Sequence, residues 1–198
     1  MHENNDNAGS RLGMWLFLYT EIMLFGGLFI LYSVYYSKYP AEFAAAGGKL
    51  ELPLGALNTG LLLLSSFTAA ASIESLRKGA QRAALGLLGS TVLLGLVFLF
   101  NKYLEWSHKF AHGIFPGSET LLKGPKGETV FYGLYFTLTG LHALHVFLGC
   151  AVLSACWVLV LKGRVTGGRM NLLENTGLYW HLVDIVWIFL FPLFYLIL

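Results

Sequence analysis

The sequence predicts an all-α integral membrane protein, folded as a bundle of five transmembrane helices. Of its 198 residues, 56% are hydrophobic and only 12% are charged, and the mean hydropathy of +0.64 exceeds that of water-soluble domains. The chain contains five apolar runs long enough to cross a bilayer, which takes about 20 helical residues. Glycine, proline and basic residues separate these runs, and such clusters end helices.

We expect the helices over about 12–36, 54–73, 83–104, 129–161 and 174–198, within a single membrane domain over 1–198. These five helices fill the chain, so no soluble domain is expected. The first run follows a polar stretch with one basic residue, Arg11, and it is roughly twice as long as the apolar core of a signal peptide. It is therefore expected to remain as a membrane anchor.

The distribution of lysine and arginine predicts the orientation. On the N-terminal side these residues concentrate in two short turns beside helix ends, where the positive-inside bias acts most strongly, whereas a long loop dilutes them on the other side. We therefore expect the N-terminus inside and the C-terminus outside. The N-terminal side has Arg11, Arg77, Lys78, Arg82, Lys162, Arg164 and Arg169, and the opposite side has Lys38, Lys49, Lys102, Lys109, Lys123 and Lys126.

Composition and absent motifs exclude several functions. A net charge of +2 is too small to attract nucleic acid or an acidic substrate. The sequence has no Gly-rich phosphate loop, nucleophile elbow, Cys-x-x-Cys or haem-attachment motif, so we assign no catalytic residue. The two cysteines, Cys150 and Cys156, lie in one apolar run on different faces of a helix, which predicts buried, reduced, structural thiols.

Ionisable residues inside the apolar runs mark the candidate site, because a charged side chain costs about 2.5 to 3.5 kcal/mol at the centre of a membrane helix. Glu21 lies well inside the first run. One hypothesis makes it a proton-binding or proton-relay carboxyl. The other makes it a protonated acid that is hydrogen-bonded to a neighbouring helix. The residue's position leaves both open.

Two further pairs lie in the last two runs. His142 and His145 are three residues apart and share one helical face, and His181 and Asp184 repeat that spacing. We favour an interhelical polar network in which Asp184 fixes a histidine tautomer. A metal site, a haem held between histidines and a transport path stay open, although a His-x-x-His pair without surrounding carboxylates is a weak metal signal.

Two glutamates lie near helix ends. Glu105 ends the third run and can pair with Lys102 or Lys109 on the same face, but we favour the interpretation of an interface acid at a solvated helix end. Glu174 falls in the first turn of the last helix, where a negative charge complements the helix dipole. Its position requires no catalytic role.

At these residues the sequence resembles subunit III of the haem–copper oxidases, the cytochrome c oxidase family, along nearly its whole length. Five blocks occur in the family's order, and the last two are highly specific because they match Thr-Gly-x-His-x-x-His-Val and Tyr-Trp-His-(Phe/Leu)-Val-Asp. The blocks are Gly13–Glu21 (GMWLFLYTE), Leu57–Thr59 (LNT), Glu105 with Trp106, Tyr135–Val146 (YFTLTGLHALHV) and Tyr179–Trp187 (YWHLVDIVW).

The resemblance implies a five-helix bundle of the subunit III type, with no metal, haem or copper bound by this chain. Haem and copper would belong to partner subunits, namely the catalytic subunit I, subunit II and a small subunit IV. The family's subunit III holds phospholipid in a cleft, eases oxygen entry and sustains proton uptake. Glu21 aligns with the family's buried carbodiimide-reactive glutamate, and a polar lock between the last two helices would comprise His142, His145, His181, Glu174 and Asp184.

One departure concerns the number of helices, because longer family members have seven and this chain begins at what looks like their third. The two other helices form one wall of the lipid cleft, so an extended catalytic subunit or another chain would supply that wall, or it is absent. The five-helix form occurs in bacterial oxidases. We therefore expect a multi-pass protein of the bacterial inner membrane, with a cytoplasmic N-terminus and a periplasmic C-terminus.

The leading hypothesis is a subunit III without redox centres in a proton-pumping terminal oxidase of the cytochrome c oxidase type. The alternatives within this family are subunit III of a quinol oxidase and the related accessory protein of nitric oxide reductase. Two hypotheses come from other classes. One is an independent membrane cytochrome or metalloenzyme that uses His142, His145 and His181, and the other is a small proton-coupled transporter centred on Glu21.

Overall fold

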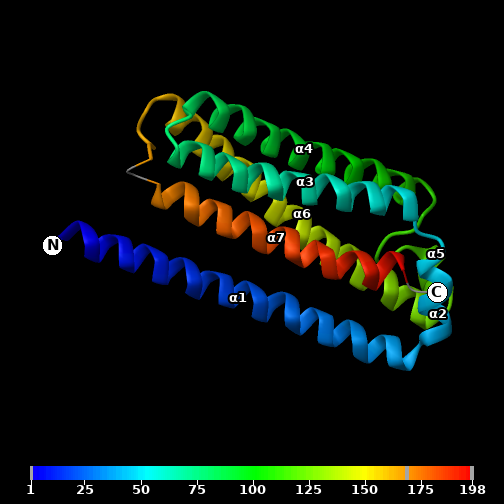
Figure 1. Ribbon diagram of the computed structural model, residues 1–198. Coiled ribbons are helices and arrows are strands. Elements are labelled where there is room, and N and C mark those ends of the chain that lie inside the picture. The colour runs from blue at the N-terminus through cyan, green and yellow to red at the C-terminus, as the bar shows by residue number, and fades with distance from the viewer. Residues whose placement is uncertain (1, 168–169, 197–198) are drawn as a thin grey trace.

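The computed structural model describes residues 2–167 and 170–196, which form seven helices. Five of them are long and apolar enough to cross a membrane, which confirms the predicted all-α membrane fold. Two short helices, α2 and α5, lie in loops at one end of the molecule (Figure 1). The helices are α1 (His2–Lys38), α2 (Pro40–Gly47), α3 (Leu52–Arg77), α4 (Gln81–Ala111), α5 (Glu119–Leu122), α6 (Lys126–Leu161) and α7 (Asn171–Tyr195).

The largest differences from the expected boundaries occur where polar residues continue a helix beyond its apolar run. The helix expected to end at 104 continues to Ala111, and the first helix begins at His2 rather than near 12. The chain leaves α4 through Gly113, whose φ of +69° favours glycine. Arg169 and the last two positions of the expected final helix lie outside the described residues.

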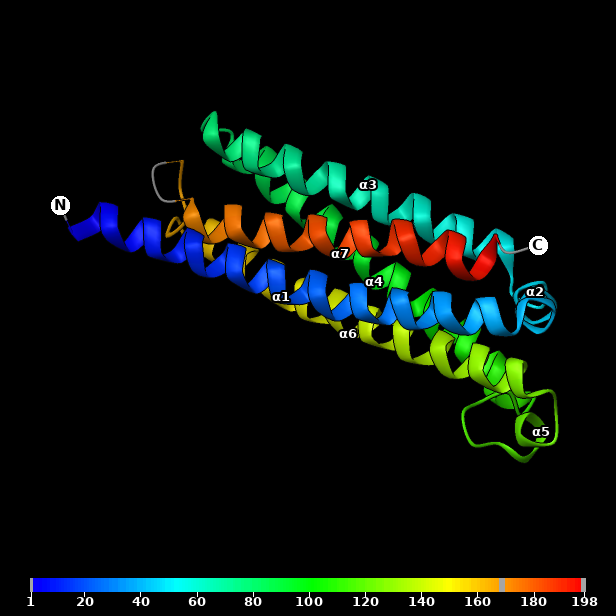
Figure 2. The same ribbon diagram turned by 90° about the horizontal axis from the view of Figure 1, so that it is seen from below.

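Four helices form a closed bundle, in which α3 and α4 make one antiparallel pair and α6 and α7 make another. Neighbouring contacts run from α3 to α4, from α4 to α6, from α6 to α7 and back from α7 to α3. Helix α1 lies outside this bundle, along α7 and α6 (Figures 1 and 2). The five crossings place the start of α1 and the end of α7 at opposite ends of the molecule (Figure 1).

Two tryptophans of α7 occupy the centre of the bundle. Trp180 is fully buried, and its indole Nε1 donates to Ser65 Oγ of α3 at 3.1 Å. Its ring lies against Gly95 of α4 and Gly149 of α6, where a Cβ atom would come within 2.8 and 2.7 Å of the ring. Trp180 therefore contacts all three other helices of the bundle, and the two glycines permit that contact.

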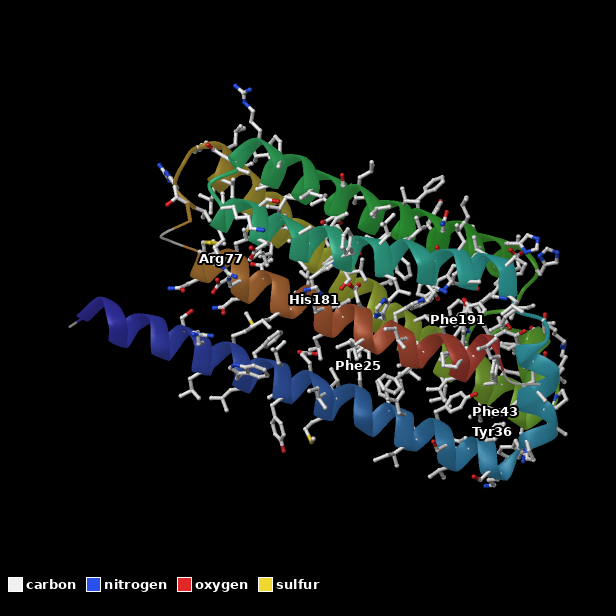
Figure 3. All side chains as sticks on the ribbon, in the orientation of Figure 1. Phe25, Tyr36, Phe43, Arg77, His181 and Phe191 are labelled. Carbon is white, nitrogen blue, oxygen red and sulfur yellow. The ribbon has the colours of Figure 1, made fainter. Side chains whose placement is uncertain are left out.

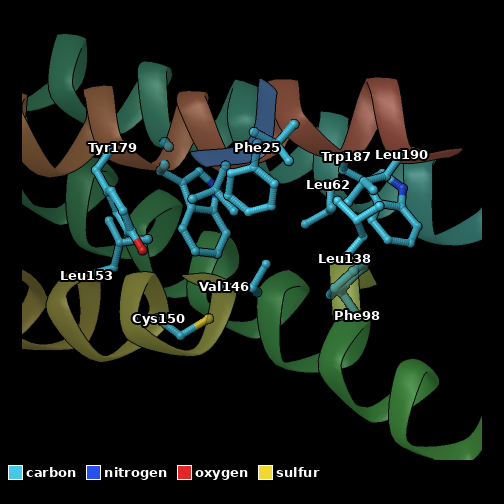
Figure 4. Packing of buried hydrophobic residues seen from close by; sticks show 14 of the residues in the cluster. Phe25, Leu62, Phe98, Leu138, Val146, Cys150, Leu153, Tyr179, Trp187 and Leu190 are labelled. Carbon is cyan, nitrogen blue, oxygen red and sulfur yellow. The ribbon is translucent and has the colours of Figure 1, made fainter. Parts of the chain in front are cut away.

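Trp187 repeats this arrangement two turns later. Its Nε1 donates to Thr59 Oγ1 of α3 at 3.0 Å, and its ring packs edge-on against Phe98 of α4 at 4.9 Å between centroids (Figure 4).

Cys150 and Cys156 are both buried, free thiols. Cys150 Sγ lies where a Cβ on residue 95 would be 2.6 Å away, so this thiol fills core space.

Helix α2 closes the end of the bundle at which α1 finishes. Its Phe43 is fully buried and makes edge contacts with Tyr32 at 5.4 Å and Phe131 at 5.3 Å. The Tyr32 hydroxyl donates to the backbone oxygen of Leu193 and so ties α1 to α7. This aromatic group holds the outlying helix at its C-terminal end.

Because Trp180 packs closely against Gly149 of α6, adding one methyl group at position 149 is predicted to lower the stability of the protein. Gly149→Ala would place a Cβ 2.7 Å from the ring and is expected to destabilise the protein by about 1–3 kcal/mol through overpacking. Gly133→Ala, on the same helix in open space, is the control and is expected to be neutral or stabilising because alanine favours helix. Thermal unfolding in detergent measures both variants, and equal melting temperatures would contradict the prediction.

Candidate functional site

The first contact between ionisable side chains joins α1 to α6. Glu21 Oε2 lies 2.9 Å from His145 Nε2, with the two side chains only 13% and 11% exposed. The other ring nitrogen of His145, Nδ1, lies 2.7 Å from the backbone oxygen of Leu141. Aromatic rings surround the pair, with Phe25 at 5.4 Å and Tyr179 at 6.4 Å from the imidazole centroid.

The distance is that of an ion pair rather than of a hydrogen bond, because Glu21 Oε2 has no hydrogen-bond partner among the described residues. A carbonyl oxygen only accepts hydrogen bonds, so Nδ1 of His145 carries a hydrogen and Nε2 of the neutral ring presents a lone pair. A lone pair and a carboxylate oxygen 2.9 Å apart repel each other unless a proton is bound to one of them. A proton on either group would remove this repulsion. Chemically, such a pair can accept or release a proton inside the membrane.

His142 does not join that pair. It is fully buried, and within the described residues neither of its ring nitrogens has a hydrogen-bond partner. Its ring instead lies between Phe98 at 5.5 Å and Trp187 at 5.1 Å. Packing against aromatic rings, rather than hydrogen bonding, thus fixes its position.

His181 and Asp184 face α3. The Ser66 hydroxyl of α3 lies 2.6 Å from His181 Nδ1. Asp184, nearly one turn further along α7, is 3% exposed, and both of its carboxylate oxygens lack a hydrogen-bond partner among the described residues.

Glu174 also faces α3, since its Oε1 accepts from Arg77 Nη2 at 2.9 Å at the partly exposed end of α7. The five residues therefore do not form one polar lock between the last two helices. Direct polar contacts between α6 and α7 come instead from the Tyr179 hydroxyl, which donates to the backbone oxygen of His145 at 3.0 Å, and from Cys156 Sγ, which lies 3.6 Å from Thr176 Oγ1. Spacing along a helix identified which faces are polar but not which neighbour each face meets.

Glu105 requires a correction, because it is not a solvated helix end. It is 3% exposed, and its Oε2 accepts from Lys102 Nζ at 2.9 Å. Its Oε1 accepts from the hydroxyls of Tyr135 and Tyr195 at 2.7 Å each. Helix α4 continues to Ala111, so Glu105 lies within the helix, and it faces Tyr135 of α6 and Tyr195 of α7.

Lys102 completes this buried cluster. Its Nζ also donates to Tyr195 at 2.8 Å and lies 5.1 Å from the centre of the Trp187 ring. Lys109, one of the two partners expected for Glu105, is buried over the rings of Tyr132 and Tyr135. The sequence indicated that Glu105 can pair with Lys102. It gave no indication that Tyr135 and Tyr195, which come from distant segments, contact Glu105.

The metal and haem hypotheses gain no structural support. Within the described residues, no group of three or more histidine, cysteine, aspartate or glutamate side chains could hold a metal ion. The two histidines of α6 point to different surroundings, His145 to α1 and His142 to aromatic rings of α4 and α7.

The buried ion pair predicts a large and partly reversible loss of stability. Glu105→Gln leaves Lys102 as an uncompensated buried charge and is expected to cost about 3–5 kcal/mol. Adding Lys102→Met to that variant is expected to restore much of the loss, because the charge is removed as well. Chemical or thermal unfolding measures each variant.

The matched control is Glu119→Gln. Glu119 pairs with Lys123 at 2.9 Å, but both side chains are more than three-quarters exposed, so a change within about 1 kcal/mol is expected. If Glu105→Gln cost no more than this control, or if the double variant were less stable than Glu105→Gln, the assigned role of the pair would be wrong.

Comparison with known proteins identifies the family. A family model described as cytochrome c oxidase subunit III matches residues 1–197. The chain is 33% identical over 205 residues to the cytochrome bo(3) ubiquinol oxidase subunit 3 of Pseudomonas aeruginosa, over 98% of this chain and 88% of that protein. It is 34% identical to the probable quinol oxidase subunit 3 of Staphylococcus haemolyticus, over 99% and 91% of the two chains, and 33% identical to the cytochrome c oxidase subunit 3 of Mammuthus primigenius, over 92% and 67%. The chain therefore belongs to the cytochrome c oxidase subunit III family and is an integral membrane subunit of a haem–copper oxidase.

Proposed function

We propose that this subunit supports proton uptake, oxygen access and stability in a partner catalytic subunit that reduces oxygen to water, in an oxidase of the cytochrome c type. The observation that carries the proposal is the Glu21–His145 pair, in which two ionisable side chains lie 2.9 Å apart inside candidate membrane-spanning helices. A subunit that shares a proton between two side chains can buffer proton delivery without taking part in electron transfer. Haem and copper would lie in partner subunits I and II.

The second candidate is subunit III of a quinol oxidase. What favours it is the extent of similarity, because two relatives named as quinol oxidase subunits align over 88% and 91% of their own length, compared with 67% for the mammoth cytochrome c oxidase subunit. The electron donor binds elsewhere in either complex. The residues of this chain are therefore expected to act in the same way in both.

A phospholipid is the proposed ligand of the groove between α1 and α7. The groove has a volume of about 380 Å³, and its exclusively apolar and glycine lining suits an acyl chain. Phe25 lines the groove and also contacts the His145 ring, so a lipid there would cover the Glu21–His145 pair. The lining residues are Ile22, Phe25, Gly26, Phe29, Leu182, Ile185, Val186 and Phe189.

The proposed orientation has the N-terminus in the cytoplasm of a bacterium. Lys102 and Lys109 are buried within α4, so they do not count among the positive residues of the loops on the side opposite the N-terminus. The lower count on that side supports the proposed orientation. Among the described residues, this leaves Lys38, Lys49, Lys123 and Lys126 on that side, against Arg11, Arg77, Lys78, Arg82, Lys162 and Arg164 on the N-terminal side.

Purification from the native membrane in a mild detergent tests the assembly. We expect this chain to co-purify with a partner that contains haem and copper, detected by optical spectrum and mass spectrometry. Oxidation of cytochrome c or of quinol by the purified complex then separates the two oxidase types. A colourless chain that purifies alone would contradict the proposal and favour a transporter centred on Glu21.

Replacement of Glu21 tests its role. Glu21→Gln is expected to leave assembly intact, because a neutral amide retains most of the shape and hydrogen-bonding capacity of a protonated acid. It is expected to reduce the number of turnovers before inactivation, by less than the roughly 100-fold effect of losing a direct acid–base group. Glu174→Gln, which removes only a partly exposed ion pair, is the control. Loss of assembly in Glu21→Gln alone would make Glu21 a structural carboxylate.

A further inference from the structure

A pair of exposed histidines lies at the C-terminal end of α4. His108 and His112 are four residues apart, a spacing that places side chains on one face of a helix, and the centroids of their rings are only 4.4 Å apart. Both residues are exposed. This end of α4 lies at the end of the molecule where Phe43 of α2 is found (Figure 3). The proposed function does not use these two rings.

The ring of His112 is oriented for a ligand at Nε2. Its Nδ1 lies 2.8 Å from the backbone oxygen of His108. Because a carbonyl oxygen only accepts hydrogen bonds, Nδ1 carries the hydrogen in this contact, and Nε2 of the neutral ring presents a lone pair. Histidines that bind metal ions almost always donate their other ring nitrogen to a carbonyl, a carboxylate or water. The tautomer of His112 therefore suits a metal ligand.

Glu51 provides the corresponding group for His108. It directly precedes α3, and among the described residues its side chain makes no capping hydrogen bond to that helix. Its Oε1 lies 3.9 Å from His108 Nδ1, which is beyond hydrogen-bond distance but close enough for the negative charge to favour a hydrogen on Nδ1. Nε2 of His108 then presents a lone pair as well. Two neighbouring imidazoles thus offer the same ring nitrogen.

The surroundings of the pair favour a cation. The last backbone carbonyls of a helix carry a partial negative charge, and α4 ends at Ala111, directly before His112. The Glu51 carboxylate adds a full negative charge beside His108. Lys109, the residue after His108, is buried over two tyrosine rings. Its ammonium group therefore points into the bundle, whereas the histidines point outward.

From these contacts we infer that His108 and His112 form a two-histidine binding site for a divalent transition-metal ion, with water as the remaining ligands. Imidazole nitrogen suits Zn²⁺, Cu²⁺ and Ni²⁺, whereas Mg²⁺ and Ca²⁺ prefer oxygen ligands. Two histidines four residues apart on a helix also bind zinc in the His-Glu-x-x-His motif. The site goes beyond the proposed function and does not depend on Glu21.

Glu51 is assigned an orienting role in this site and is not a ligand. The described part of the chain contains no group of three histidine, cysteine, aspartate or glutamate side chains that could hold a metal ion, so the protein supplies two ligands. A bound ion would connect the last turn of α4 to the first residue of the loop that follows it. It would thereby hold the chain just before the turn at Gly113.

Titration with Zn²⁺ alone tests the site, using the protein purified in a mild detergent and a zinc-binding dye as competitor. His112→Ala is expected to weaken the binding of one Zn²⁺ ion by at least about 10-fold, because even the loss of a group that only orients a ligand costs about 10–100-fold. Equal zinc binding by wild type and His112→Ala would overturn the inference, since the bound ion would then lie elsewhere.

The matched control keeps the number of histidines and removes their spacing. It combines His112→Ala with Ser107→His. Position 107 is exposed, and adjacent side chains on a helix do not face each other. This double variant is expected to bind zinc as weakly as His112→Ala. Binding as tight as that of wild type would overturn the inference, because any two surface histidines would then suffice.

X-ray absorption at the zinc edge tests the ligands. The difference between wild type and His112→Ala is expected to show imidazole nitrogen at about 2.0–2.1 Å from zinc, and a difference with oxygen ligands only would overturn the inference. Glu51→Gln is expected to keep this signature but to weaken binding about 10-fold. Unchanged affinity in Glu51→Gln would overturn the orienting role assigned to Glu51.

Discussion

The bundle depends on how closely α7 approaches its neighbours, and the Trp180 side chain sets that approach. In a membrane, apolar side chains gain little from contacting each other rather than lipid, so helices associate through close packing and interhelical hydrogen bonds. Trp180 supplies both, because its ring fills the space left by Gly95 and Gly149 and its nitrogen bonds Ser65. Trp187 does the same with Phe98 and Thr59. These contacts fix the rotation of α7.

That rotation decides where the ionisable residues lie. With Trp180 directed into the bundle, Tyr179 turns toward α6 and His145, while His181 turns toward Ser66 of α3. The Glu21 carboxyl approaches His145 from α1, outside the four-helix bundle. Two carboxyls of the same membrane protein thus occupy separate surroundings. Glu21 lies beside the His145 imidazole and its aromatic neighbours, whereas Asp184 is buried without a hydrogen-bond partner among the described residues.

The sequence was sufficient for the number and order of the membrane helices, because an apolar run of about 20 residues has few other stable structures in a bilayer. It also identified Glu21, His145 and Asp184 as ionisable residues inside membrane helices, but the shared spacing of His142 and His145 did not bring them to one site, because His145 meets α1 and His142 meets aromatic rings. It failed at Glu105, where a polar sequence suggested solvent. Burial there results from Tyr135 and Tyr195, which are 30 and 90 residues away, and no local pattern encodes such partners.

The cluster around Glu105 shows why a membrane protein can keep a lysine and a glutamate out of water. Each oxygen of the carboxylate has donors, and the ammonium has the carboxylate, two hydroxyls and aromatic faces, so desolvation is offset by several contacts at once. Among the described residues, Asp184 has no such hydrogen-bond donors. The fold thus contains one carboxylate with a full set of partners at one end of the bundle and one without a hydrogen-bond partner near its middle, and packing alone buries the second.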